Sequence, residues 1–366
     1  MRVTRVSARD FRNLDRVEAA LGGAVTVVHG PNGAGKTNLL EALYFGCTAR
    51  SCRTSNEREL VGFGAKVARV EVEVEAEDGS HRLEVGLEPG EAKRVSVDGV
   101  SATGPAGADV RPLVSVFMPD RLDLVKGAPA LRRAHLDQLV AALWPARSAN
   151  RAAYARGLAQ RNALIARIRA GAAQPGLLDT WDSELARAGI ALMSDRAEAC
   201  ALVALRFAER ARDLGLPEEA TLAYRPRSRA EGVEALRAEL AARRDEDLAR
   251  GFSAHGPHRD EVLLAHAGRA LRAYGSQGQQ RLALLALLFA ERDVLLDARG
   301  LPPLMLLDDV MSELDFTRRE RLVELLAGGG QAVITTTDLE HVPGGAGEGV
   351  AALAVMSGRL AQEPVA

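Results

Sequence analysis

Residues 30–37 have the types and spacing of a loop that binds a phosphate chain. The segment reads Gly30-Pro31-Asn32-Gly33-Ala34-Gly35-Lys36-Thr37 and matches the pattern G-x-x-x-x-G-K-[ST]. Its glycines let backbone N–H groups turn inward around a polyphosphate, and the helix that follows directs its positive end at the same anion. The lysine of such a loop reaches the β- and γ-phosphates, and the threonine hydroxyl is a ligand of Mg²⁺. We predict that this loop binds ATP, with Lys36 as a catalytic cation.

A pair of carboxylates follows an apolar segment late in the chain. Residues 303–307 (PLMLL) are typical of a buried strand, and Asp308 and Asp309 come directly after it. Ligands of parallel α/β sheets bind at the carboxyl ends of the strands. We predict that Asp308 holds Mg²⁺ together with Thr37, and that Asp309 orients or deprotonates the attacking water.

The distance along the chain between these two motifs favours one group of ATPases. Roughly 270 residues separate Lys36 from Asp308, which is typical of ABC-type and SMC-type heads with an insert between their nucleotide motifs. Such heads need a signature loop at a helix N-terminus that completes the nucleotide site of a second subunit. Residues 274–281 (YGSQGQQR) precede the apolar run 282–290 and fit this need. Ser276 and the N–H of Gly278 are therefore expected to meet a γ-phosphate across a dimer interface.

Three further segments bear on this interpretation. Residues 312–315 (SELD) occupy the place of a D-loop, and a helix N-cap with acidic first-turn residues explains them equally well. The Q-loop is expected within Phe117–Arg121. Residues 335–338 (TTTD) lack the histidine usual in transporter ATPases, and Asp309 stands where a glutamate is usual. The shorter carboxylate is compatible with slow turnover.

The sequence periodicity predicts the elements that position these groups. The predicted strands and helices of the first part are a buried strand at 25–29, a helix at 38–45, and strands at 70–75, 82–87 and 93–97 with a turn at Asp98-Gly99. We predict an α/β fold: a P-loop ABC/SMC-type ATPase head with an antiparallel β subdomain, interrupted by a mostly helical lobe.

The interruption is visible as a change of composition. Residues 121–250 are rich in Ala, Leu, Arg and Glu and have helical periodicity, including a helix of about 20 residues at 231–250. Strand-like segments return at 261–264, 303–307 and 332–335. The predicted organisation is therefore a discontinuous ATPase head of residues 1–120 and 251–366, with a helical lobe of residues 121–250.

The positive charge of the chain is concentrated in one part of this lobe. The net charge is −2, yet residues 121–170 carry ten Lys or Arg and two Asp. The candidates for contact with a DNA backbone are Lys126, Arg132, Arg133, Arg161, Arg167 and Arg169. The alternative is a set of solvated helix faces with i,i+4 ion pairs. Since only Trp144 and Tyr154 interleave with these cations, duplex or junction shape is expected to matter more than base stacking.

Composition excludes several classes of protein. The 366 residues are 47% hydrophobic and 26% charged, which is ordinary for a globular chain of more than one domain. The apolar run 282–290 is too short to cross a bilayer, and the charged N-terminus is not a secretory signal. Three cysteines fit a reduced compartment. We expect a cytoplasmic protein without a membrane partner.

Taken together, the motifs resemble those of the RecF family of bacterial recombination-repair ATPases, within the SMC/ABC superfamily. The segments that carry the resemblance, in the family's order, are FRNL at 11–14, GPNGAGKTNLLEALYF at 30–45, VKG at 125–127, RR at 132–133, LD at 136–137, QRN at 160–162, GPHRD at 256–260, YGSQGQQR at 274–281 and LLDDVMSELD at 306–315. They cover almost the full length.

The resemblance implies a function in the repair of damaged DNA, including replication maintenance, recombination and the SOS response. It implies an ATP-dependent homodimer that binds DNA at single-strand gaps or junctions and promotes RecA loading with RecO and RecR. Slow, DNA-dependent ATP hydrolysis would reset it. By the family's pattern Arg12 lies near the nucleotide, and the alternative is a surface charge at a strand end.

Other functions remain open from the residues alone. An ABC ATPase serving a transporter is disfavoured by the missing switch histidine, and an SMC-like structural head by an insert of only about 130 residues. A small-molecule kinase would need acceptor-pocket residues that the sequence does not indicate. The triplet His258-Arg259-Asp260 has no nucleophile in suitable company for a catalytic triad, so it is expected to brace the signature loop or to contact DNA.

Overall fold

A computed structural model describes the chain except for residues 103–109, 119–121, 313, 346, 348 and 363–366. It contains two compact units, one formed by Met1–Arg121 with Leu295–Ala366 and one formed by Leu122–Val294. The sequence pattern predicts that residues 251–294 belong to the head. The structure groups them with the second unit, since β10 (Glu261–His266) pairs antiparallel with β9 (Ala220–Arg225) of that unit.

The first unit contains a mostly parallel sheet that carries the phosphate loop. Its strand order is β15-β14-β3-β13-β12-β8. The strands are β3 (Val25–His29), β8 (Val114–Phe117), β12 (Leu304–Leu307), β13 (Ala332–Thr336), β14 (Val350–Met356) and β15 (Arg359–Gln362). All neighbours are parallel except the edge strand β15. Because β3 and β12 point the same way, the residues that follow them lie at one edge of the sheet.

A second sheet of the same unit is antiparallel. Its order is β2-β1-β4-β5-β6-β7, with β1 (Arg2–Phe11), β2 (Leu14–Ala20), β4 (Ala68–Ala76), β5 (Gly79–Leu87), β6 (Arg94–Val97) and β7 (Val100–Ser101). Buried valines alternate with more exposed charged residues along β4, as one dry and one wet face require. Asp98 and Gly99 both have positive φ, 52° and 77°, in the turn between β6 and β7.

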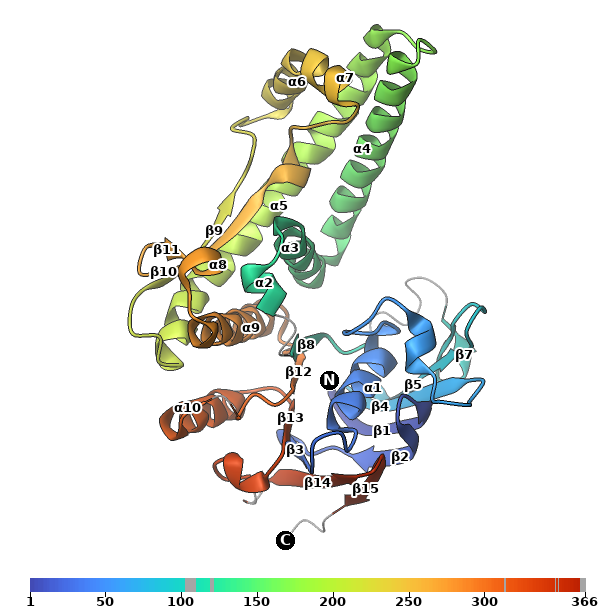
Figure 1. The fold of residues 1–366 in the computed structure, drawn as a ribbon, viewed down its shortest axis with the longest axis vertical. Helices are drawn as coiled ribbons and strands as arrows, with labels where there is room; N and C mark the ends of the chain where they lie inside the picture. The colour runs from blue at the N-terminus through green and yellow to red at the C-terminus, as the bar shows by residue number, and fades with distance from the viewer. Residues whose placement is uncertain (103–109, 119–121, 313, 346, 348, 363–366) are drawn as a thin grey trace. The chain divides into compact units, whose positions relative to one another are not determined.

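Helix α1 (Lys36–Thr48) joins the two sheets through a common core. Leu40 and Leu43 of this helix pack in one cluster with Val70 and Val72 of β4 and with Val28 of β3. The helix lies close to β4 because Gly46 has no side chain; a Cβ there would clash with Val72. Helix α10 (Phe316–Ala327) follows β12 (Figure 1). These observations confirm the α/β class of the head and its antiparallel subdomain.

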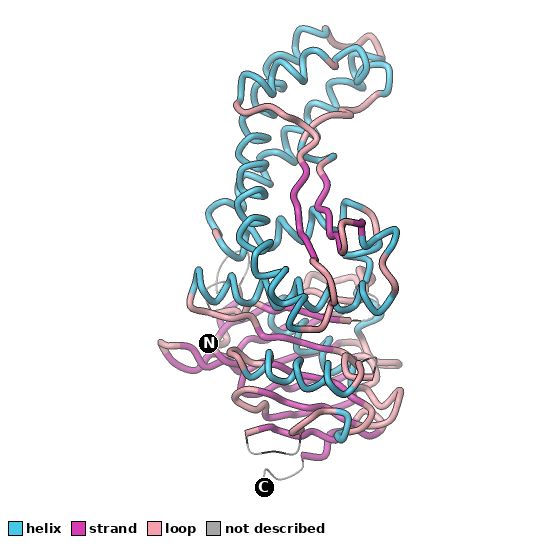
Figure 2. Tube along the Cα trace, turned by 90° about the vertical axis from the view of Figure 1, so that its left-hand side faces the viewer, coloured by secondary structure: helices cyan, strands magenta, loops and turns pink. Residues whose placement is uncertain are grey.

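The second unit is mostly helical (Figure 2). Its helices are α2 (Asp123–Lys126), α3 (Pro129–Leu143), α4 (Ser148–Arg169), α5 (Leu178–Asp213), α6 (Val233–Ala242), α7 (Arg244–Arg250), α8 (Leu271–Tyr274) and most of α9 (Gln277–Arg299). Helices α4 and α5 pack along each other, and the pair confirms that the interruption is helical. None of the helices in the described part of the chain is both long and apolar enough to cross a membrane.

The single helix expected at 231–250 was a wrong prediction, because the structure has two helices there, α6 and α7. Arg243 leaves helical geometry with φ −105° and ψ 7°, and its N–H bonds back to Leu240 by the tighter i−3 spacing. Helix α7 then begins at Arg244 and carries Asp247, which is buried. The periodicity of the sequence did not indicate this break, because neither Gly nor Pro stands at it.

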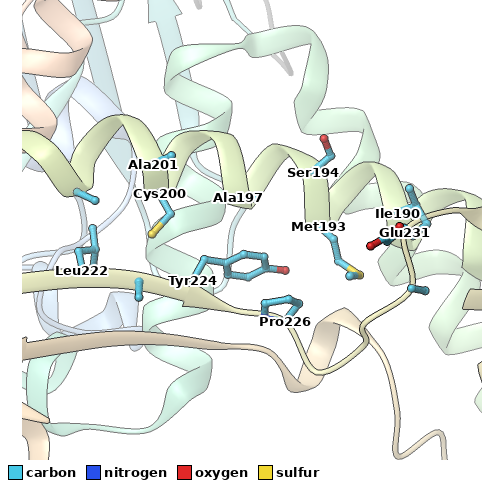
Figure 3. Close-up of a pocket in the computed structure, with 13 residues that line it drawn as sticks. Ile190, Met193, Ser194, Ala197, Cys200, Ala201, Leu222, Tyr224, Pro226 and Glu231 are labelled. Carbon is cyan, nitrogen blue, oxygen red and sulfur yellow. The ribbon is translucent and has the colours of Figure 1, made fainter.

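A small antiparallel sheet, β11-β10-β9, completes this unit; β11 is Arg269–Ala270. Helix α5 faces β9 largely with small side chains, including Ala197 and Ala201. Their small size leaves an open groove of about 510 Å³ between the helix and the strand, next to Met193 and Tyr224 (Figure 3). The groove lies in the unit that does not contain the phosphate loop.

Candidate nucleotide site

The loop between β3 and α1 depends on two glycines for its close packing. Gly30 has φ 146° and Gly35 has φ 116°, which other residues rarely adopt. A Cβ at Gly30 would clash with the carbonyl oxygen of Val355, and one at Gly35 would come within 3.0 Å of Asn13. The loop from Gly30 to Gly35 therefore enters α1 in a fixed, sharply turned conformation.

Lys36 folds back over this loop. Its Nζ donates to the carbonyl oxygens of Gly30 and Pro31, at 2.7 and 3.0 Å. Burial lowers the pKa of Lys36, while the nearby charges of Asp309 and Asp308 act in the opposite direction. The lysine of the loop and the two aspartates therefore lie close enough for their charges to interact.

Asp308 is the centre of the carboxylate side of the site. Thr37 Oγ1 donates to this carboxylate and lies 2.9 Å from each of its oxygens. Thr335 Oγ1, from the end of β13, donates to Asp308 Oδ1 at 2.6 Å and accepts from the N–H of Asp309 at 2.8 Å. Burial raises the pKa of Asp308, and the two hydroxyl hydrogen bonds oppose that rise.

Thr335 is a residue whose role the sequence reasoning missed. The sequence marks it only as part of a segment without histidine, yet it is fully buried and holds both aspartates in place. Asp309 itself has φ 45°, a left-handed conformation unusual for a residue other than glycine. Its Oδ1 is buried and has no hydrogen-bond partner among the residues that the structure describes.

These groups fit Mg²⁺ and a triphosphate. Hydroxyl and carboxylate oxygens, from Thr37 and Asp308, are the ligands that Mg²⁺ prefers, usually completed by phosphate oxygens. Within the described ranges no cluster of three or more His, Cys, Asp or Glu side chains is placed to hold a metal by itself. The unpartnered Oδ1 of Asp309 is a buried acceptor next to this pair, as a group that orients water requires.

Arg12 lies beside α1 but is bound by a carboxylate. Its guanidinium donates to both oxygens of Glu41, each at 2.9 Å, and Glu41 is fully buried. Ser51 and Arg53 also donate to Glu41. The contacts show Arg12 as a brace for α1, and they do not show it as an exposed charge at a strand end.

The signature segment forms the exposed N-terminus of α9. Ser276 Oγ accepts from the N–H of Gln279 at 3.2 Å, and Gln279 Oε1 accepts from the N–H of Ser276 at 2.9 Å. This reciprocal pair is a capping box. Ser276 and Gly278 are exposed, and the first turn of this 23-residue helix carries no acidic residue. The helix end is therefore open to an anion.

Two other predicted loops have partial descriptions. Asp315 caps α10 by accepting from the N–H of Arg318 at 2.9 Å, as its N-cap interpretation requires. Glu313 lies outside the described residues. Of the predicted Q-loop segment Phe117–Arg121, Phe117 ends β8, and residues 119–121 also lie outside them.

Two of the six cations proposed for DNA contact are buried, so those predictions were wrong. Arg161 has no exposed surface; it pairs with Asp182 at 2.7 Å and with Asp247 at 2.6 Å. Arg132 is 6% exposed and pairs with Glu261 at 2.9 Å. Side chains that neutralise carboxylates from such buried positions do not reach a DNA backbone. The number of cations in residues 121–170 could not distinguish them from surface residues.

The other four cations differ in exposure. Lys126, Arg167 and Arg169 lie at or near the surface, whereas Arg133 is half-buried and donates to the backbone oxygen of Asp260. Arg259, of the triplet expected to brace the signature loop or to contact DNA, is a further exposed cation, and it has an aromatic companion. Arg259 lies over the ring of Phe252, at 5.5 Å from its centroid, and both side chains are exposed. Phe252 lies far from residues 121–170, where the positive charge is concentrated, so the sequence pattern did not indicate this pair.

The histidine of the GPHRD segment is a structural residue of the second unit. His258 Nδ1 lies 2.8 Å from the hydroxyl of Tyr154, and its Nε2 lies 2.9 Å from the backbone oxygen of Ser253. Burial lowers the pKa of His258 to about 4. The neighbouring Asp260 is buried and accepts from Tyr224 and from Arg196. Hence His258 and Asp260 brace this unit internally.

We predict that replacing Arg161 by methionine strongly destabilises the fold. The substitution leaves Asp182 and Asp247 buried without their common cation, which costs about 3 kcal/mol of unfolding free energy. Chemical denaturation measures this cost. Arg167→Met, on the exposed face of the same helix, is the control and should change the unfolding free energy by less than about 0.5 kcal/mol. Equal stability of the two variants would contradict the burial of Arg161.

Known proteins match this chain over nearly its whole length. The profile of the RecF/RecN/SMC N terminal domain family matches residues 2–345. A DNA replication and repair protein RecF of Anaeromyxobacter sp. (strain Fw109-5) is 39% identical over 371 residues, with 98% of this chain and 99% of the relative covered. The protein of the same name from Streptomyces avermitilis is 38% identical, with 94% and 95% covered.

Solved structures also resemble this chain over nearly its whole length. A structure described as the recombination mediator protein RecF with ATP, in the RecFOR pathway, superposes with a TM-score of 0.88 at 26% identity, over 99% of this chain and 97% of the other. An Smc head bound to the C-terminal winged-helix domain of ScpA superposes with a TM-score of 0.59 at 16% identity, over 98% and 96%. The second likeness concerns the fold alone.

Proposed function

Since the chain belongs to the RecF family, within the RecF/RecN/SMC group of ATPase heads, we propose that it is an ATP-dependent DNA-binding ATPase of DNA repair and replication. The observation that carries this proposal is the convergence of Lys36, Thr37, Asp308 and Asp309 at one edge of the parallel sheet. The named relatives are DNA replication and repair proteins, and one solved relative is described with ATP.

Each residue of the site has a distinct role in the proposed hydrolysis of ATP. The backbone N–H groups of the loop residues other than Pro31, together with the Nζ of Lys36, hold the phosphates and stabilise charge on the transferred group. Thr37 and Asp308 would hold Mg²⁺, which would neutralise negative charge on the phosphates. Asp309, fixed by its N–H bond to Thr335, accepts a hydrogen bond from the attacking water. Thr335 fixes both aspartates, because its hydroxyl donates to the carboxylate of Asp308 and accepts from the N–H of Asp309.

A second copy of the chain supplies the remaining group. We propose that Ser276 and the N–H of Gly278, at the exposed end of α9, contact the γ-phosphate bound to the loop of the partner. ATP then holds two chains together, and its slow hydrolysis releases them. By family membership, the proposed partners are DNA at gaps and junctions, with RecR, RecO and RecA for loading.

Contact with the DNA backbone is proposed for the surface cations of the second unit, Lys126, Arg167 and Arg169, with the half-buried Arg133 as a lesser contributor. These contacts carry no base sequence information and weaken with salt. The test is retention on gapped and duplex DNA with ATP, with ADP and without nucleotide. Retention of the wild type that does not depend on ATP would contradict the proposed function.

We predict that Arg167→Glu with Arg169→Glu weakens ATP-dependent retention on DNA at least tenfold, because two attractive charges become repulsive. Measurement of binding at fixed salt gives the loss. The control is Arg187→Glu with Arg237→Glu, the same charge change at exposed residues of this unit that pair within their own helices. Equal retention by the two double variants would place the DNA surface elsewhere.

A further inference from the structure

Four arginines form one row across the wet face of the antiparallel sheet. Arg16 on β2 lies opposite Arg9 on β1, and Arg9 lies opposite Arg69 on β4. Arg69 lies opposite Gly86 on β5, and Gly86 lies opposite Arg94 on β6. Residues directly opposite each other point to the same face of a sheet. All four arginines are exposed, and we call them the arginine row.

The arginine row lacks the internal partners that other arginines of this face have. Arg2 pairs with Glu75, Arg5 with Glu73, and Arg82 with Glu71. For the four members of the row, no ion pair is found among the residues that the structure describes. Like charges directly opposite each other on adjacent strands destabilise a sheet. A local arrangement that costs stability without a compensating contact indicates a binding function.

The neighbouring row of the same face has the opposite charge. Glu18, Ser7, Glu71, Glu84 and Ser96 are opposite one another, two residues further along each strand. Residues of both rows line a hollow of about 450 Å³. A polyanion attracted by the arginine row is therefore repelled by the next row, and the two rows together confine it to a line.

The spacing of the row suits a phosphate backbone. Strands in a sheet are about 4.8 Å apart, so the four steps from Arg16 to Arg94 span about 19 Å. One strand of duplex DNA has a phosphate about every 3.4 Å along the axis, so about five to six phosphates of one strand lie within this length of the axis. Gly86 interrupts the side chains of the row, and it leaves space between Arg69 and Arg94. Each guanidinium binds a phosphate as a fork.

We propose that the arginine row binds the sugar–phosphate backbone of one DNA strand, as a second contact surface on the unit that contains the nucleotide site. This proposal rests on the proposed DNA-binding function and adds a surface separate from the surface cations of the helical unit. The contact is independent of base sequence, because it is made to phosphates alone.

The test uses a double variant that combines Arg9→Gln and Arg69→Gln. This variant is compared with the wild type in the presence of ATP. Binding to duplex DNA is measured over a series of salt concentrations. The slope of log K against log salt should become shallower by about 0.9 for each phosphate that the variant no longer neutralises, about 1.8 in total. The control is Arg5→Gln with Arg82→Gln, an equal charge change at paired arginines of the same face, for which the slope should change by less than about 0.5.

Two further measurements separate this proposal from others. ATP binding should be the same in both double variants and the wild type, which shows that the nucleotide site is intact. The melting temperature of the Arg9→Gln, Arg69→Gln variant should equal or exceed that of the wild type, because the variant relieves repulsion between like charges on adjacent strands. Equal slopes for the two double variants would overturn the binding of DNA by the arginine row and would leave the proposed function of the protein unaffected. Absence of DNA binding by the wild type would overturn the proposed function and this surface with it.

Discussion

Replacing Asp309 by asparagine is expected to lower ATP turnover about a thousandfold and to keep the ATP-bound dimer assembled. The carboxylate has a buried oxygen without a partner in the described part of the chain, next to the ligands of Mg²⁺. An amide keeps the size of the side chain but cannot take a proton from water. Turnover is measured by phosphate release, and the lifetime of the dimer by sizing after dilution into ADP.

The conservative change Asp309→Glu is the control for this prediction. It keeps the carboxylate at the position where other ABC-type heads have glutamate, so turnover should remain within about tenfold of the wild type. If the asparagine variant hydrolysed ATP at the normal rate, the role of Asp309 would be wrong, and the binding role of Asp308 would be unaffected.

Replacing Lys36 by methionine is expected to abolish ATP-dependent pairing of two chains and to lower turnover about a thousandfold. Methionine has nearly the same length, so it fills the space of the lysine stem without a cation. The variant loses the charge that lies near Asp308 and Asp309 and that would face the phosphates. ATP affinity by calorimetry and molar mass in ATP are the measurements.

Lys66→Met is the matched control, because Lys66 is an exposed lysine of the same unit. It should leave ATP affinity and pairing unchanged. Pairing of the Lys36→Met variant in ATP to the extent of the wild type would show that the phosphate loop does not control association. Retained pairing with lost turnover would instead restrict Lys36 to chemistry.

The phosphate loop and its flanking elements could be predicted because their signal is local. Apolar residues 25–29 and the glycine pattern after them specify a strand, a loop and a helix without reference to distant residues. The structure places β3 and α1 where that pattern predicts them. The position of Asp308 after a buried strand is equally local, and its bond to Thr37 follows from parallel strand order.

Other features depend on contacts between distant segments and were not predictable in this way. Arg161 reaches Asp247 across 86 positions of sequence, so composition could not identify it as buried. Thr335 meets Asp308 only because β12 and β13 are neighbours in the sheet. The arginine row depends on the register of five strands, because four of them supply one arginine each and β5 supplies Gly86 between Arg69 and Arg94. Residues 71–91 carry eight Asp or Glu and one Arg, so the local charge balance does not indicate the arginine row.

Two copies of this chain are expected to share two ATP molecules and to separate after hydrolysis. Light scattering at micromolar protein, with ATP, with ADP and without nucleotide, tests it most directly. We expect twice the chain mass of 39.0 kDa in ATP and the single mass in the other two conditions. The single mass under all three conditions would contradict it.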